Sequence, residues 1–299
     1  MISSIMGKYL MDKGLISQEQ FADLLVQQHK TRVKLGMIAV SEGYMSKEEA
    51  EKVNQLQEII DKRFGDIAVE KGYLTKGQVD ALLQKQCDAY LAFAQALESQ
   101  QLLTVELLEA YMVDYRFDND LADDDIEVLK SDDVDRILPL FLPDGSTGYI
   151  DAARTALRLL MRCVDSEVFP GKAYITEEID ADYGVFQRVK GDHGITGGIT
   201  YGIAGRQEEL ISAAASYRQE GLVEVNGEML DKIGELINCI SSLYVSSASK
   251  EGISLEIFPP ESGKDIQKVR SKEMMVMPLY IKGSCINLLL TADDKIEMN

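Results

Sequence analysis

The sequence predicts two domains, an all-α domain of repeated helical hairpins and, after it, an α+β domain with two long helices packed on a mainly antiparallel sheet. Three observations support this fold class. The first third of the chain repeats internally, the last half alternates strand-like runs with amphipathic helical runs, and an acidic segment lies between them. We assign residues 1–116 to a helical repeat domain, 117–146 to an acidic linker and 147–299 to the α+β domain.

The composition is that of a globular, strongly acidic protein. Of the 299 residues 45% are hydrophobic, and the net charge is −19 with a pI near 4.6. Such a surface repels nucleic acids and anionic membranes, so we expect neither as a partner. No apolar run reaches the ~18 residues of a membrane helix, and residues 1–14 lack the pattern of a signal peptide. We therefore expect a cytoplasmic protein without membrane insertion.

The residue types that build most metal and nucleophile sites are scarce. The chain has two histidines, far apart, and four cysteines without Cys-x-x-Cys spacing. A zinc site or a Ser-His-Asp triad is therefore not expected, and we predict no metal site of the chain's own. The cysteines are expected to be reduced thiols in the core.

The N-terminal repeat has a period of 29 residues, which separates Gly7, Gly36 and Gly65. The same step relates Gly14, Gly43 and Gly72, then Gln28, Gln57 and Gln86, and a fourth, degraded copy continues at Gln101–Thr104. Each copy predicts a short helix closed by the second glycine and a longer helix capped by Ser17, Ser46, Thr75 or Thr104. One hairpin cannot bury its own apolar stripe, so we expect consecutive hairpins to stack.

This pattern resembles the N-terminal domain of type II secretion and type IV pilus assembly ATPases. Some members of that family bind cyclic di-GMP through tandem copies that carry an Arg two residues before the first Gly. The corresponding positions here are Ile5, Lys34, Arg63 and Ala92, and only Arg63 matches. Lys34 and Arg63 are thus the candidate nucleotide-binding residues, while a stacked helical interaction module is the favoured interpretation. No Walker motif follows, so the chain is not such an ATPase.

The segment 117–146 contains a dense run of Asp and then Pro139 and Pro143. Charge repulsion and low apolar content favour an extended, solvated linker. Residues 131–133 are candidate caps of a short helix that ends before Pro139.

The last domain predicts helices and strands in a definite order. The expected elements are a helix at 149–165, strands at 172–179, 183–189 and 194–204, helices at 207–217 and 226–249, and strands at 253–258, 274–281 and 285–292, with a hairpin loop at 282–284. The apolar faces of the two long helices need a sheet to pack against.

The helix predicted at 226–249 carries the candidate site. Opposite its apolar stripe, Asp231, Glu235 and Asn238 stand at i, i+4 and i+7 in one column. A carboxamide both donates and accepts hydrogen bonds and can therefore orient a water molecule, whereas a carboxylate suits a cationic partner. The alternative interpretation is an ordinary polar face of an amphipathic helix.

The longer pattern is more specific. Asp231-x3-Glu235-x2-Asn238, followed by Pro259 and Pro260, resembles the signature of the CheC/CheX/FliY chemotaxis phosphatases, although the gap before the proline is slightly shorter here. The helix at 149–165 lacks Glu-x-x-Asn, which implies one site per protomer, as in the CheX type. The resemblance makes Glu235 and Asn238 the expected catalytic residues, and we add Asp231 and Pro260 as candidates for substrate docking.

The resemblance implies a substrate, the phosphorylated receiver domain of a CheY-like response regulator. That receiver would supply its own Mg²⁺ and lysine, so the chain would need no cofactor of its own. Asn238 would orient the attacking water and Glu235 would pair with the receiver's lysine. Two alternatives stay open, a non-catalytic adaptor that binds a receiver or a flagellar-switch protein, and a regulator that responds to cyclic di-GMP. The sequence also leaves a homodimer open.

Overall fold

The computed structural model describes residues 1–30, 33–59, 62–85, 88–191, 198–207, 209–210, 227–281, 283–293 and 296–299. The chain forms two compact units that divide between Asp132 and Asp133. The first unit is all-helical, and the second contains the sheet.

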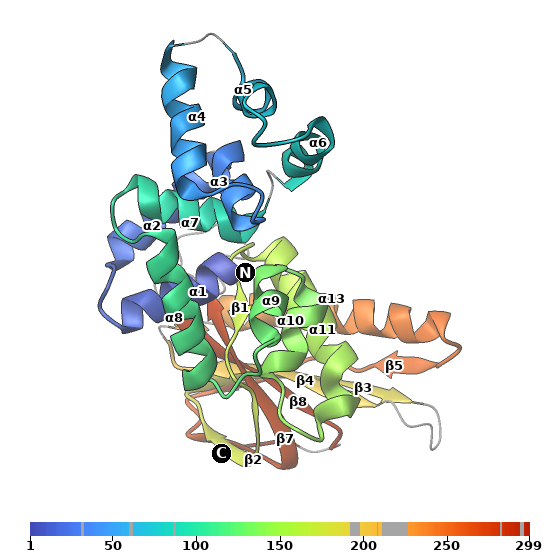
Figure 1. Cartoon of the computed structure of the whole chain (residues 1–299). Coiled ribbons are helices and arrows are strands. Elements are labelled where there is room, and N and C mark those ends of the chain that lie inside the picture. Colours follow the sequence, from blue (N-terminus) through green and yellow to red (C-terminus); the bar gives the residue numbers. More distant parts are fainter. Residues whose placement is uncertain are drawn as a thin grey trace. The chain divides into compact units, whose positions relative to one another are not determined.

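The first unit contains the four predicted helical hairpins (Figure 1). Their helices are α1 (Ile2–Asp12), α2 (Gln18–Lys30), α3 (Leu35–Ser41), α4 (Lys47–Ile59), α5 (Phe64–Glu70), α6 (Lys76–Gln84), α7 (Ala89–Ser99) and α8 (Val105–Asp118). The predicted caps are present. Ser17, Ser46 and Thr75 each accept a hydrogen bond from the backbone N–H three residues on, and the side chain there bonds back to the cap N–H. Thr104 accepts from the N–H of Leu107.

The turn inside each hairpin shows how the fourth copy is degraded. Gly14, Gly43 and Gly72 have φ angles of 71°, 68° and 74°, and Gln101 occupies the same place with a φ of 55°. Glycine adopts this conformation without steric cost, whereas a residue with a Cβ does not. The fourth copy keeps the turn but has lost the residue that suits it best.

Not every hairpin stacks on its neighbour in the sequence, which corrects the predicted arrangement in part. α2 packs against α7, so the first hairpin lies on the fourth, while the second packs on the third through α4 and α5. Gln28 Nε2 donates to the Ala89 carbonyl at 3.1 Å, and Gln95 Oε1 accepts from the Lys34 backbone N–H at 2.6 Å. This packing order follows from α7, which buries seven of its residues (90, 91 and 93–97). Such a helix needs packing partners around most of its circumference.

The acidic segment is folded, whereas the sequence predicted an extended linker over 117–146. It contains α9 (Asp125–Lys130), α10 (Val134–Ile137) and the 3₁₀ helices η2 (Leu138–Phe141) and η3 (Ser146–Tyr149). Leu129, Ile137 and Leu138 are fully buried, because apolar residues spaced among the aspartates outweigh the charge repulsion. The predicted cap is present at Asp133, whose carboxylate accepts from the Asp135 N–H at 2.9 Å.

The second unit continues with further helices and a sheet (Figure 1). The elements are α11 (Ile150–Cys163), β1 (Phe169–Pro170), β2 (Tyr174–Asp180), β3 (Tyr183–Gly191), β4 (Ile199–Gly205), α13 (Gly227–Lys250), β5 (Leu255–Ile257), β6 (Glu261–Lys264), β7 (Lys268–Ile281), β8 (Ser284–Thr291) and β9 (Glu297–Met298). Most of the helix predicted at 207–217 and the first part of the strand predicted at 194–204 lie outside the described residues.

These strands form one antiparallel sheet with the main order β1-β7-β8-β4-β3-β5. β2 and β9 pair with β7, and β6 pairs with β3. β7 begins at Lys268, well before the strand predicted at 274–281, because its first part pairs with β2 and β9.

One long helix packs on the sheet, where the sequence predicted two. α13 has 24 residues and contacts β3, β4 and β5, while α11 has 14 residues and lies against α13. The helix predicted at 149–165 ends early because Asp165 accepts from the Glu167 N–H at 2.8 Å and turns the chain toward β1.

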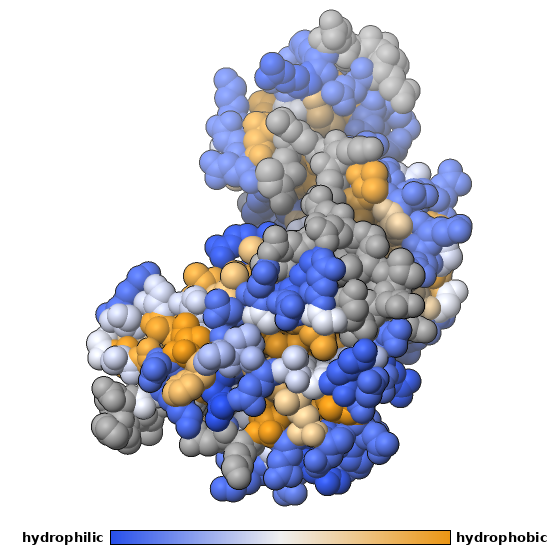
Figure 2. Space-filling model, turned by 180° about the vertical axis from the view of Figure 1, so that it is seen from behind, coloured by the Kyte–Doolittle hydropathy of each residue, from blue (hydrophilic) through white to orange (hydrophobic). Residues whose placement is uncertain are grey.

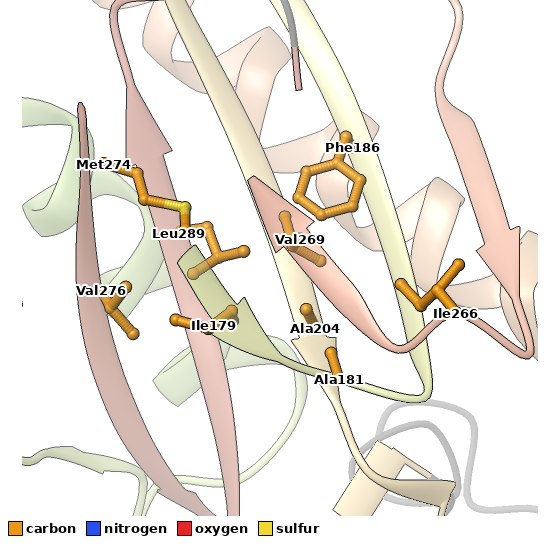
Figure 3. Close-up of a cluster of buried hydrophobic side chains, with 9 residues drawn as sticks. All are labelled: Ile179, Ala181, Phe186, Ala204, Ile266, Val269, Met274, Val276 and Leu289. Carbon is orange, nitrogen blue, oxygen red and sulfur yellow. The ribbon is translucent and has the colours of Figure 1, made fainter. Parts of the chain in front are cut away.

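Residues of β3 alternate between the two faces of the sheet. Val185 and Gln187 face α13, whereas Phe186 enters a hydrophobic cluster (Figure 3). The cluster consists of Ile179, Ala181, Phe186, Ala204, Ile266, Val269, Met274, Val276 and Leu289. This cluster joins β2 and β7 to β3, β4 and β8. The curled sheet therefore has a second core, and β3 packs against it on the face away from α13.

The surface seen in Figure 2 carries hydrophobic residues in separate patches among hydrophilic ones. Cys163 and Cys239 are exposed and Cys285 is half-buried, so the prediction of core thiols is wrong for these three. Each lies at the margin of an apolar stripe or strand face, and Cys87 lies outside the described residues. None of the described helices is both long and apolar enough to cross a bilayer.

Limited proteolysis should give two stable fragments. The turn at 131–133, with Ser131 and Asp133 exposed, is where the chain passes between the two units. Exposed turns at such boundaries are preferred cleavage sites, and each unit has its own buried residues. Mass spectrometry of a digestion time course should show both fragments persisting. Rapid loss of one fragment on its release would contradict independent folding.

Candidate functional site

α13 presents the predicted polar column to solvent. Asp231, Glu235 and Asn238 are exposed along about two turns of the helix. The opposite face buries Met229, Leu230, Ile233, Gly234, Leu236, Ile237, Ile240 and Ser241. Leu243, which helical spacing places on the same apolar face, is 40% exposed.

Pro260 packs against the same helix. A Cβ built on Gly234 would lie 3.5 Å from Pro260 Cγ and 3.8 Å from a methyl group of Val185. The proline ring and β3 therefore approach the helix closely at Gly234, the residue just before Glu235. The proline end of the sequence pattern thus lies beside the part of α13 that carries its acidic and amide residues.

The prolines occupy an irregularity in the edge of the sheet. The register pairs on its two sides are Val189↔Ile257 in β5 and Phe186↔Glu261 in β6. Gln187 and Arg188 therefore face the three residues 258–260, which is one residue more than a regular ladder allows. Prolines lack the N–H that a ladder needs and are found at edge strands and bulges.

A buried amide connects this bulge to α13. Gln187 is 1% exposed, and its Nε2 donates to Asn238 Oδ1 at 2.9 Å and to the Phe258 carbonyl at 3.0 Å. Its Oε1 is buried and has no hydrogen-bond partner among the described residues. Two such bonds contribute a net ~0.5–1.5 kcal/mol each, and an unpaired buried acceptor costs about 1–3 kcal/mol. The cost of the unpaired acceptor therefore offsets most of the stability that the two hydrogen bonds of Gln187 contribute.

The contacts of Gln187 define which way the Asn238 carboxamide faces. A backbone carbonyl only accepts, so the Phe258 carbonyl requires the Nε2 end of Gln187. That Nε2 in turn requires the Oδ1 end of Asn238. The Nδ2 donors of Asn238 then face away from Gln187, and Oδ1 keeps a second lone pair.

Gln187 is the residue that sequence reasoning missed. It lies in the apolar run at 183–189, where the only signal is an amide on a strand face that otherwise reads as core. Its contacts with Asn238 and Phe258 span 51 and 71 residues of sequence. A local sequence pattern therefore cannot predict them.

The second predicted site lies in the first unit. Lys34 and Arg63 occupy equivalent positions, directly before α3 and α5, and line one cavity of about 980 Å³ together with Lys62. Glu51, Asp66 and Asp80 line it too. Lys62 Nζ lies 2.5 Å from Glu70 Oε1. Among the described lining residues the three cations are therefore matched by three carboxylates, which leaves no excess of positive charge for an anionic ligand.

The sequence matches no protein-family model and no curated protein sequence. Several solved structures are similar to about half of the chain, including the following three. One is a CheC-like superfamily protein from Shewanella sp. PV-4, with a TM-score of 0.43 and 15% identity over 48% of this chain and 96% of that chain. Another is the chemotaxis protein CheX from Vibrio vulnificus, with a TM-score of 0.40 and 16% identity over 49% and 97%.

The third is the CheX–CheY–BeF3–Mg²⁺ complex from Borrelia burgdorferi, with a TM-score of 0.37 and 15% identity over 50% of this chain and 95% of that chain. The N-terminal helical region has no named match. About half of the chain is thus similar, at low identity, to CheC- and CheX-type chemotaxis proteins.

Proposed function

We propose that the chain is a phosphatase that hydrolyses the aspartyl phosphate of a CheY-like receiver domain. The observation that carries the proposal is the exposed Asn238 carboxamide, which Gln187 binds in one orientation and which shares a column with Glu235. The sequence pattern that includes both residues resembles the chemotaxis phosphatase signature, as described above.

Asn238 has the groups that in-line hydrolysis needs. Its Nδ2 can donate to a phosphoryl oxygen while the second lone pair of Oδ1 accepts a hydrogen from the attacking water. Held by its hydrogen bond to Oδ1, the water would keep a lone pair directed at phosphorus. Positioning of this kind accounts for much of the catalysis of phosphoryl transfer.

Glu235 and Asp231 would set the docking register. Glu235 lies one turn before Asn238 and would pair with the lysine that a receiver carries beside its phosphoaspartate. Asp231 and Pro260 would contact the receiver at the margin of the site. With a net charge of −19, the chain attracts a phosphorylated partner only through such cations on that partner.

The Mg²⁺ of this reaction belongs to the substrate. A receiver holds the ion beside its phosphoaspartate, where it neutralises charge on the phosphoryl group. The chain's own residues then bind the receiver and place one water molecule.

The non-catalytic adaptor is the competing function. It uses the same column for docking and requires no reaction at Asn238. Phosphate release from a phosphorylated receiver with Mg²⁺ separates the two functions, because an adaptor leaves the rate at the receiver's own value.

Asn238→Ala should abolish most of the activity. Loss of one preorganised hydrogen-bonding group at a reacting centre costs ~10²-fold or more in rate. Gln187 Nε2 keeps its bond to the Phe258 carbonyl, so the variant should lose only about 1 kcal/mol of stability. Asn238→Asp should be no better, since a carboxylate has no donor and repels the phosphoryl group. The measurement is phosphate release by purified variants whose folding is checked by thermal unfolding. Full activity in a folded Asn238→Ala variant would end the phosphatase proposal.

Glu235→Ala should weaken productive docking, raising KM at least as much as it lowers kcat. The matched control is Glu228→Ala, an exposed residue of the same helix outside the motif, which should behave as wild type. A Glu235→Ala variant with wild-type KM and kcat would contradict the docking role.

Cyclic di-GMP should not bind at Lys34 and Arg63. The acidic groups that line the same cavity neutralise these cations, and a ligand with two phosphates needs an excess of positive charge. Isothermal titration calorimetry with the nucleotide should show no heat of binding. Micromolar affinity that Arg63→Ala removes would overturn this expectation and favour a nucleotide-responsive regulator.

A further inference from the structure

The bulge beside β3 holds the Phe258 carbonyl in a fixed direction. The residue before a proline is confined to extended backbone, and Pro259 follows Phe258 directly. The Phe258 N–H also donates to the Arg188 carbonyl at 2.9 Å, and Pro260 packs at Gly234 of α13. The carbonyl is therefore anchored on both sides, and it accepts from Gln187 at 3.0 Å.

We propose that Gln187 is a positioning residue that determines which end of the Asn238 carboxamide faces inward. The fixed Phe258 carbonyl holds the Nε2 end of Gln187 in place, and this Nε2 then selects Oδ1 of Asn238. The inference rests on the proposed phosphatase function. The Phe258 carbonyl can only accept, so it requires the Nε2 of Gln187. The same Nε2 donates a second hydrogen bond to Asn238, whose Oδ1 must therefore face inward. Asn238 Nδ2 consequently faces solvent, where a phosphoryl oxygen would bind.

Gln187 is poorly explained as a purely structural residue. Within the described part of the chain its Oε1 is buried without a hydrogen-bond partner, a loss that an apolar side chain of the same length would avoid. Val185 and Val189, its neighbours on the same strand face, are apolar and 1% exposed. A role in packing would favour a third apolar residue there, whereas control of the neighbouring amide requires a donor.

Orientation is the property at stake because Asn238 is exposed. Without an inward partner, its amide can turn about the last side-chain bond, which has a broad, roughly two-fold profile. The wrong orientation offers an acceptor to an anionic phosphoryl oxygen and a donor to the water. A fraction of the population would then be unreactive while docking through Glu235 stays intact.

The first test is Gln187→Met, which keeps length and approximate volume but removes the donor. We expect kcat for receiver dephosphorylation to fall ~10-fold or more, with KM little changed because the docking residues are untouched. The matched control is Thr200→Val on β4. Thr200 is 4% exposed, and its Oγ1 donates to the Asp293 carbonyl at 3.2 Å. That variant also removes a part-buried side-chain hydrogen bond of the sheet, but it should keep wild-type kcat.

The second test is a pH profile of Gln187→Glu. Burial and two facing oxygens raise the pKa of a carboxyl at this position. Below that pKa the single O–H of the neutral acid is shared between Asn238 Oδ1 and the Phe258 carbonyl, so part of the population keeps a donor to Asn238. Above that pKa the carboxylate only accepts and draws Nδ2 inward. The ratio of variant to wild-type kcat should therefore fall as the pH rises. A purely structural role predicts no such step within the range where circular dichroism shows both proteins folded.

The outcomes separate this inference from the proposed function. Full activity in Asn238→Ala removes the phosphatase proposal, and the inference with it. An inactive Asn238→Ala variant combined with wild-type kcat in Gln187→Met overturns the positioning role alone.

Discussion

The candidate site depends on how β3 is held between two unlike neighbours. On one side β4 pairs with it without interruption from Tyr183 to Val189. On the other side β5 and β6 share its edge and leave the bulge at 258–260 between them. The regular ladder fixes which residues face α13, and the irregular edge supplies a backbone carbonyl that the sheet does not use. A slip of one residue would exchange Gln187 with Phe186, placing an amide in the hydrophobic cluster and a ring against Asn238.

The sequence predicted the features that are encoded locally. The caps at Ser17, Ser46 and Thr75, the bounds of α13 and the exposure of Glu235 and Asn238 each follow from residues within two turns of one another. The hairpin between β7 and β8 was predictable for the same reason. The roles of Glu235 and Asn238 were inferred because the spacing of these residues resembles the chemotaxis phosphatase signature. The structure does not test those roles.

The features that sequence reasoning missed depend on distant contacts. The order of packing among the helical hairpins follows from α7, whose burial on most sides becomes informative only once its partners are known. The first part of β7 is polar where it pairs with β2, through Lys268 and Arg270 beside Glu178, so it lacks the apolar alternation of a strand. The folded acidic segment was missed because the charge of its aspartates masked the buried Leu129, Ile137 and Leu138.

The order of packing in the first unit also constrains how that unit can assemble. In a solenoid each repeat buries its stripe on the one before it, so structure can grow as the chain leaves the ribosome. Here the first hairpin finds its main partner in α7, and the bonds of Gln28 and Lys34 reach 61 residues ahead. The first hairpin must therefore wait for the fourth copy to be synthesised, and the unit should fold more slowly than a helical protein with only local contacts.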